Sequence, residues 1–251
     1  MLLTKVLVII ILVIIIYVIY SLISFKEDLP EHDYKAIRST LQTGDIILFS
    51  CNEHDSALDK LMYGLRTKLL GSEYGHVGLI FKSSSGEIYL VECTDKSHIG
   101  HWFEVPFNNK NKGGVRIINF DKLIEEYYEK TKAYFAVMST YYPIPNKLFT
   151  SKLSKYTDII FENKNILICL VAIDTYMSHD LAVKAIQKLN TNNDRTNRMM
   201  CSEFVYDFLY ECGVVDNYCS KLFWPHLFPS VYFNMLSKVK YSKPIKFCYL
   251  T

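Results

Sequence analysis

The feature that most constrains this chain is an uninterrupted apolar run at its N-terminus. No charged or strongly polar residue occurs from Val6 to Ile19, and the apolar character continues to Phe25 with only two serines intervening. A helix needs about 20 apolar residues to cross a bilayer, where the lack of water forces the backbone to pair within the segment. The run therefore predicts a transmembrane anchor over residues 1–25, a bilayer as partner, and a single-pass membrane protein.

A cleaved signal peptide is the alternative interpretation of the same run. The run is longer than the roughly 7 to 15 apolar residues of a signal peptide, and no small-residue cleavage site follows it. Lys5 precedes the run, whereas Lys26 follows it and is itself followed by Glu27 and Asp28. Basic residues near the two ends tilt the orientation only slightly toward an inside N-terminus. We therefore expect an uncleaved anchor, with its orientation left open.

Composition restricts what the rest of the chain can be. Beyond the anchor roughly 225 residues remain, enough for one well-packed domain. The chain has 28 basic and 26 acidic residues, a formal charge of +2, and its basic residues are scattered. A nucleic-acid partner is not expected, because such proteins gather their basic residues into a patch or stripe. The seven cysteines show no repeating spacing, which argues against a disulfide scaffold.

Hydrophobic periodicity and turn signals divide the remaining chain into short elements. Residues 26–42 predict a linker with a short helix, and residues 43–251 predict the folded domain. Residues 141–158 are expected to be irregular, and Gly213 is expected to stop the last helix. The predicted strands are Ile46–Ser50, His76–Phe81, Ile88–Glu92 and Val115–Phe120, and the predicted helices are 55–70, Asp121–Met138 and Met200–Cys212.

Cys201 lies at the expected start of that last helix. The positive end of the helix dipole and the backbone N–H groups of the first turn favour a thiolate there. The same N–H groups, with Ser202 in that turn, can stabilise an oxyanion on a carbonyl that the sulfur attacks. The alternative is a structural cysteine on the apolar face of the helix.

His76 opens an otherwise apolar strand and is preceded by Tyr74 and Gly75. Glycine leaves room beside the imidazole, so Tyr74 and Gly75 are candidates for lining a substrate. The alternative is a core histidine whose hydrogen bonds are satisfied internally.

Glu92 closes the next predicted strand, and its relation to His76 depends on the hairpin between them. A three-residue loop pairs positions of equal parity and places both side chains on one face, whereas a two-residue loop separates them. On one face, Glu92 can orient the imidazole and stabilise its cation as the third member of a triad. On opposite faces, it is a surface residue at a strand end.

Other constellations are less specific. Cys93, His98 and His101 match no standard zinc spacing and have no evident fourth ligand. Cys51 and His54 are too local to be diagnostic. The chain has no phosphate loop, nucleophile elbow or dinucleotide fingerprint. We therefore expect a site that needs neither a metal nor another cofactor.

Taken in chain order, the glycine–aspartate turn, the histidine strand, the glutamate and the cysteine helix resemble the circularly permuted branch of the papain-like NlpC/P60 superfamily. Bacterial YiiX/YebB-like proteins, lecithin:retinol acyltransferase relatives and a group of poxviral and other large-DNA-virus proteins share this order. The resemblance covers about Thr43–Glu92 and Arg198–Gly213 and leaves an insertion around residues 100–197. The segments that carry it are Gly44–Leu48, Gly75–Ile80, Val91–Glu92 and Cys201–Val205.

The resemblance implies an α+β fold of the permuted papain-like type, an antiparallel sheet packed on the cysteine-bearing helix, here preceded by one transmembrane helix. It implies Cys201 as nucleophile, His76 as base, Glu92 as the residue that orients the base, and a structural role for Asp45. We therefore expect a membrane-anchored cysteine hydrolase or acyltransferase that acts on an amide or ester, with lipids as one candidate substrate class.

Two alternatives to this function stay open. One is a cysteine peptidase or amidase that uses the same residues. The other is a non-catalytic membrane or virion component that retains the fold. If the protein is viral, the expected membrane is that of a host cell or a virion.

Overall fold

A computed structural model describes residues 15, 19, 32–50, 74–94, 113–131, 134–161, 198–215 and 240–249. Its centre is a seven-stranded sheet in the order β1-β9-β6-β2-β3-β4-β5, and a separate pair is formed by β7 and β8. The strands are β1 (His32–Asp33), β2 (Ile46–Ser50), β3 (Tyr74–Lys82), β4 (Ile88–Thr94), β5 (Gly114–Asn119), β6 (Phe135–Met138), β7 (Ile160–Phe161), β8 (Arg198–Met199) and β9 (Ile245–Cys248). The helices are α2 (Tyr34–Arg38), α4 (Phe120–Thr131), α5 (Asn146–Leu153), the 3₁₀ turn η1 (Ser154–Tyr156) and α8 (Cys201–Glu211).

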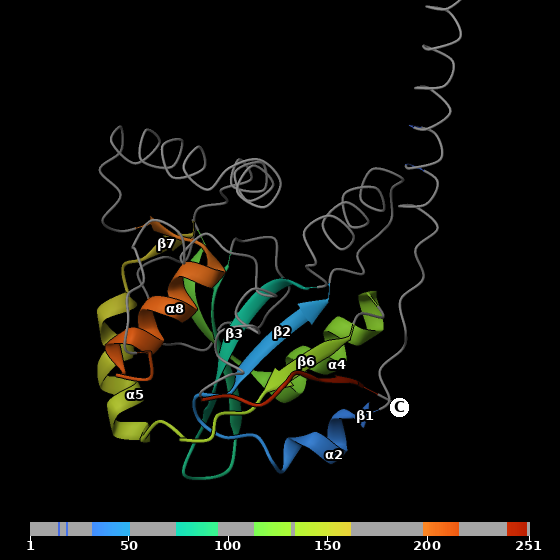
Figure 1. Ribbon diagram of the computed structural model, residues 1–251, viewed down its shortest axis with the longest axis horizontal. Helices are drawn as coiled ribbons and strands as arrows, with labels where there is room; N and C mark the ends of the chain where they lie inside the picture. The colour runs from blue at the N-terminus through green and yellow to red at the C-terminus, as the bar shows by residue number, and fades with distance from the viewer. Residues whose placement is uncertain are drawn as a thin grey trace, which may run out of the picture.

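Helices cover both faces of the sheet. In Figure 1, α8 and α5 lie on one side of β3 and β2, and α4 and α2 lie on the other. One apolar core therefore joins α8 and α5 to one sheet face, through residues such as Phe204, Phe208 and Phe149. A second core joins α2 and α4 to the opposite face, through residues such as Tyr34 and Ile124.

Burial on both faces explains the continuous apolar run of β2, in which every residue is buried. Neighbouring strands of the sheet are antiparallel except for the parallel pair β1 and β9. Within the described ranges, strands and helices do not follow an alternating βαβ order, which confirms the predicted α+β class at this level.

The hairpin from β3 to β4 decides where the two polar residues of the motif lie. The backbone N–H of Ser83 donates to the carbonyl of Glu87 at 2.9 Å and closes a three-residue turn, in which Gly86 has a φ of +85°. Leu79 pairs with Val91, so residues of equal parity face each other across the strands. Of the two registers that the sequence left open, the structure has the one that places His76 and Glu92 on the same face.

A β-bulge lies beside His76. Phe49 of β2 pairs with His76, but the next residue, Ser50, pairs with Tyr74, so Gly75 is the extra residue on β3. Bulges bend and twist a strand locally and are common next to active sites, where they change the direction of a side chain. This bulge therefore contributes to the placement of the imidazole.

Helix α8 ends just before Gly213, as predicted. Gly213 has a φ of +71°, which favours glycine. Its N–H donates to the carbonyl of Tyr210, and the N–H of Val214 donates to that of Leu209. This is the Schellman arrangement, which satisfies the last carbonyls of a helix.

The membrane prediction needs correction. Among the described residues, no helix is both long enough and apolar enough to cross a membrane. The longest of these, α4, has 12 residues, about 18 Å at the usual rise, whereas a hydrocarbon core is about 30 Å thick. The predicted localisation as a single-pass membrane protein is contradicted by this finding. Apart from Ile15 and Ile19, the predicted anchor lies outside the described residues.

Residues 26–42 contain a short helix, as predicted, which is α2. This helix contacts the domain, because Tyr34 and Arg38 both hydrogen-bond to Asp121 of α4 at 2.7 Å. The predicted insertion around 100–197 supplies β5, α4 and β6, so much of it is integral to the sheet. The helix predicted over Asp121–Met138 ends at Thr131, seven residues early. Phe135–Met138 forms the strand β6 instead. The segment expected to be irregular contains α5, whereas the predicted helix 55–70 lies outside the described residues.

Candidate active site

The centre of the site is a contact between two neighbouring strands. His76 Nε2 of β3 lies 2.6 Å from Glu92 Oε2 of β4. The side chain of His76 is 13% exposed and that of Glu92 is 2% exposed. The ring of Phe49 packs edge-on against the imidazole, with the ring centroids 5.0 Å apart. The imidazole is therefore held in one orientation by a short hydrogen bond and an aromatic neighbour.

Gly78 makes room for this contact. By the register of the hairpin, Gly78 lies opposite Glu92, two residues from His76 on the same face. A Cβ at Gly78 would lie 2.8 Å from Leu90 Cδ1 and 3.2 Å from Glu92 Cβ. The missing side chain therefore lets the carboxylate reach diagonally toward the imidazole.

Cys201 completes the arrangement from the start of α8. It lies close enough to His76 for the two side chains to interact electrostatically. Cys201 is 7% exposed and lies in the core that α8 shares with the sheet. The structure thus places His76 in contact with Glu92, and Cys201 near enough to His76 for their charges to interact.

The electrostatics of the site favour the cationic imidazole. Burial lowers the pKa of His76, but negative charge on Cys201 and Glu92 and the hydrogen bonds to both side chains outweigh burial and raise the pKa to about 10. A cationic imidazole at this position stabilises negative charge that develops on a neighbouring sulfur. Such a pair can attack an electrophilic carbon and then deliver a proton to the leaving group.

The chain before Cys201 is held to the same sheet. The Cys93 thiol of β4 donates to the carbonyl of Met199 at 3.4 Å. Glu203 caps the helix, because its carboxylate accepts a 2.7 Å hydrogen bond from the backbone N–H of Met200. These contacts place the first turn of α8, and so the Cys201 sulfur, relative to β3 and β4.

Arg116 is the residue that the sequence interpretation missed. It lies directly opposite Glu92 across β4 and β5. Its Nε donates to Glu92 Oε1 at 2.7 Å, and its Nη2 lies 2.5 Å from the same oxygen. The Arg116 side chain is 3% exposed. The signal was present, because a lone arginine in the apolar strand Val115–Ile118 needs a buried counter-charge.

The remaining predicted site residues have distinct positions. Ser202 is buried in the first turn of α8, next to Cys201. Gly75 forms the bulge before His76. Tyr74 is 2% exposed and packs edge-on against Tyr134, 6.3 Å between ring centroids, so its ring belongs to the core. Their assignment to an oxyanion hole or a substrate-lining surface stays a prediction.

Asp45 of the Gly-Asp turn has the structural surroundings that were expected. It is fully buried, and its carboxylate accepts hydrogen bonds from the backbone N–H groups of Gln42 and Thr140 at 2.8 Å each. Burial raises the pKa of Asp45 to about 6, against the effect of these two bonds.

The alternative zinc site falls partly outside the structure's described ranges. His98 and His101 are not among the described residues, and the third candidate, Cys93, is the residue whose thiol binds the carbonyl of Met199.

Comparison with known proteins provides a relative but no activity. No family model matches the chain. The chain is 37% identical over 219 residues to "Uncharacterized protein R372" of Acanthamoeba polyphaga mimivirus, and the match covers 86% of each chain. Identity at this level over most of both chains implies a shared fold and common descent. The chain therefore belongs to the same protein family as R372 of this virus.

Proposed function

We propose that the chain is a cysteine hydrolase or acyltransferase, in which Cys201 attacks the carbonyl carbon of an amide or ester. The observation that carries the proposal is the position of His76, which lies 2.6 Å from Glu92 and interacts electrostatically with Cys201. An imidazole between a thiol and a buried carboxylate is the arrangement that nucleophilic catalysis by cysteine requires. The resemblance to permuted papain-like proteins supports the same roles.

The first half of the reaction forms a thioester. The Cys201 sulfur, whose proton has passed to His76, adds to the carbonyl carbon. Backbone N–H groups in the first turn of α8, where Ser202 lies, are the candidates for stabilising the oxyanion that forms. When the intermediate collapses, the carbon–nitrogen or carbon–oxygen bond breaks and the imidazolium gives its proton to the departing amine or alcohol.

The second half removes the acyl group. Neutral His76 takes a proton from water, or from another hydroxyl or amine, as that acceptor attacks the thioester. The carbon–sulfur bond breaks, and the proton returns from His76 to the sulfur. Glu92 holds the imidazole in place and stabilises its cation through both halves, while Arg116 holds Glu92. Hydrolase and acyltransferase differ only in the acceptor.

Active-site labelling tests the proposal. We expect iodoacetamide at substoichiometric ratio to label Cys201, and peptide mapping by mass spectrometry to locate the label. Cys201→Ala should abolish the fast-reacting fraction. Cys212→Ala is the matched control at the other end of α8, because burial raises the pKa of Cys212 to about 11 and keeps that thiol protonated at neutral pH.

A substrate panel then separates the acyl classes. Aryl esters, peptide amides and phospholipids are incubated with the chain and with His76→Ala, and acyl transfer is followed by trapping with hydroxylamine. Turnover of at least one ester or amide, lost in Cys201→Ala and reduced by about 10²–10⁴ in His76→Ala, is the expected result. Equal labelling of Cys201 and Cys212, or turnover unchanged in Cys201→Ala, would refute the thiol mechanism.

A further inference from the structure

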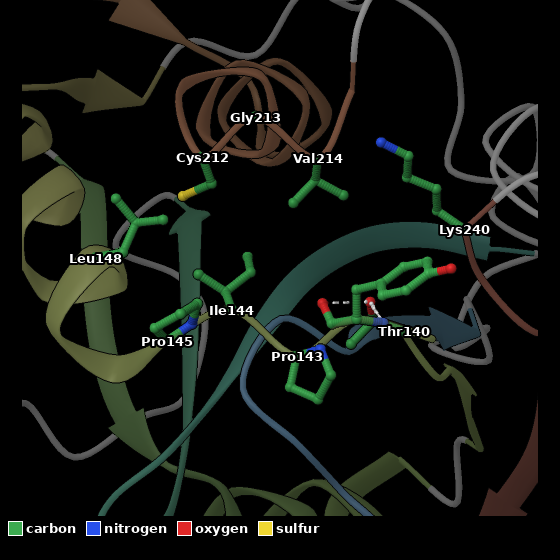
Figure 2. Close-up of a pocket in the computed structure, with 10 residues that line it drawn as sticks. Thr140, Pro143, Ile144, Pro145, Leu148, Cys212, Gly213, Val214 and Lys240 are labelled. Carbon is green, nitrogen blue, oxygen red and sulfur yellow. Dashed lines mark hydrogen bonds between the residues drawn. The ribbon is translucent and has the colours of Figure 1, made fainter.

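A cavity lies at the end of α8 far from Cys201. It has a volume of about 470 Å³, which falls within the range of small-molecule sites. Figure 2 shows it between the end of α8 above and the Pro143–Pro145 loop below. Cys201 and Cys212 are eleven positions apart on this helix, about 16 Å along its axis, so the cavity is separate from the thiol. The lining residues are Thr140, Tyr142, Pro143, Ile144, Pro145, Leu148, Cys212, Gly213, Val214 and Lys240.

The floor of the cavity is held rigidly by buried contacts. The N–H of Ile144 donates to the carbonyl of Thr43 at 2.9 Å, and the N–H of Thr140 donates to buried Asp45. Gly44 packs so closely beneath Ile144 that a Cβ there would lie 2.9 Å from Ile144 Cγ1. Two prolines flank Ile144 and fix the backbone further. The cavity therefore exists before any ligand arrives.

The walls of the cavity are apolar, and one basic side chain lies at its side. Thr140 bonds its hydroxyl to the backbone of Tyr142, both donating and accepting, so it directs little polarity into the space. The Cys212 thiol is protonated at neutral pH because burial raises its pKa, and its sulfur points toward Leu148 (Figure 2). Among the lining residues that the structure describes, Lys240 is the one that carries a charge. Such a site fits an apolar body that carries one negative charge.

We propose that this cavity binds a small anionic amphiphile, a linear or aryl monocarboxylate, with its apolar part between Ile144, Leu148 and Val214 and its carboxylate toward Lys240. Burial of apolar surface supplies most of the affinity, because each buried methylene tightens binding about fourfold. The ion pair with Lys240 adds selectivity for the acid over a neutral analogue. The proposal is independent of the chemistry at Cys201.

Calorimetric titration of the full chain with hexanoate, octanoate and decanoate tests this site. The Cys201→Ala protein is used, so that no turnover contributes to the heat. We expect one saturable site and a dissociation constant that falls about fourfold for each added methylene. The methyl ester of octanoic acid should bind about two- to fivefold more weakly than octanoate.

Variants locate the site and its charge. Val214→Phe fills the cavity from the helix, and Leu148→Phe fills it from the opposite wall. Because both side chains are half-buried, at least one of the two variants should fold and lose octanoate binding. Lys240→Met should lose the preference for the acid. Lys243→Met, which removes the same charge outside the lining, should keep that preference. Absence of saturable binding, undiminished binding in a folded cavity-filling variant, or equal effects of the two lysine substitutions would overturn the proposal.

Discussion

Replacing Arg116 by methionine should destabilise the fold more than almost any other single change at the site. Arg116 and Glu92 are 3% and 2% exposed, and two nitrogens of the guanidinium contact the same carboxylate oxygen. In Arg116→Met the carboxylate stays buried without its cation. Removing one partner of a buried ion pair costs about 3–5 kcal/mol. A typical domain has about 5–15 kcal/mol of stability, so the variant should fold but unfold easily.

A double-mutant cycle distinguishes the loss of stability caused by an unpaired buried charge from the loss caused by poorer packing. Glu92→Met alone should cost a similar amount, because it leaves the cation of Arg116 buried. In the double variant Arg116→Met/Glu92→Met neither charge remains, and methionine retains much of the apolar volume of both side chains. The double variant should therefore be at least about 2 kcal/mol more stable than the sum of the two single losses predicts.

Urea unfolding at pH 7, followed by circular dichroism, measures the three variants against the wild type. The comparison uses free energies of unfolding from transitions with equal slopes. A loss below about 1 kcal/mol for Arg116→Met, or strictly additive losses, would refute the view that Glu92 depends on Arg116. Thiol labelling of the double variant provides the second measurement. The fold should recover, but fast alkylation of Cys201 should not, because His76 has lost its carboxylate.

Three further predictions concern glycine and aspartate positions. Gly78→Ala should slow Cys201 alkylation at least about tenfold, since the added Cβ would lie 3.2 Å from Glu92 Cβ; an unchanged rate would contradict the role assigned to this glycine. Burial raises the pKa of Asp45 to about 6, so the Asp45 carboxyl binds a proton more tightly in the folded chain than in the unfolded chain. Protonation of Asp45 therefore stabilises the fold at low pH, and this stabilisation is lost as pH rises from about 4 to 6. Between about pH 4 and 6, the free energy of unfolding of the wild type in urea should therefore fall by about 3 kcal/mol relative to that of Asp45→Asn. If the two proteins show parallel pH profiles, the pKa of Asp45 is not raised. Gly213→Ala should lower the free energy of unfolding by about 1 kcal/mol in thermal unfolding, because Gly213 has a φ of +71°. The space around Gly213 is open, so the rate of Cys201 alkylation should not change. An unchanged stability would show that the helix end relaxes.

Local pattern predicted the elements that hold the site. The apolar run of Ile46–Ser50 could be identified as a buried strand, because both of its faces are covered and no polar position interrupts it. Gly213 marked the end of α8, because a helix end in the left-handed conformation favours glycine. The turn sequence Ser83–Gly86 located the hairpin, but the structure was needed to show the three-residue loop that places His76 and Glu92 on one face.

Pairing between distant segments overrode local pattern elsewhere. Residues 135–138 continue the apolar spacing of the preceding helix, yet they form β6, because the sheet places them between β2 and β9. The residues of α5 follow two prolines and looked irregular, but Phe149 and Leu153 are buried against the sheet and α8. Packing of this kind depends on segments far away in the chain, and no local window contains it.

The sequence by itself therefore indicated four strands of the sheet, the two possible hairpin registers, the approximate bounds of the cysteine helix and three candidate polar residues. Only the tertiary structure decided that these residues meet, because Cys201 is 125 positions from His76 and reaches it through the packing of α8 on β3 and β4. The structure also added Arg116, since a charge in an apolar strand shows its partner only when the neighbouring strand is in place. Spacing along the chain predicts what a residue can do, and the fold determines which other residue it contacts.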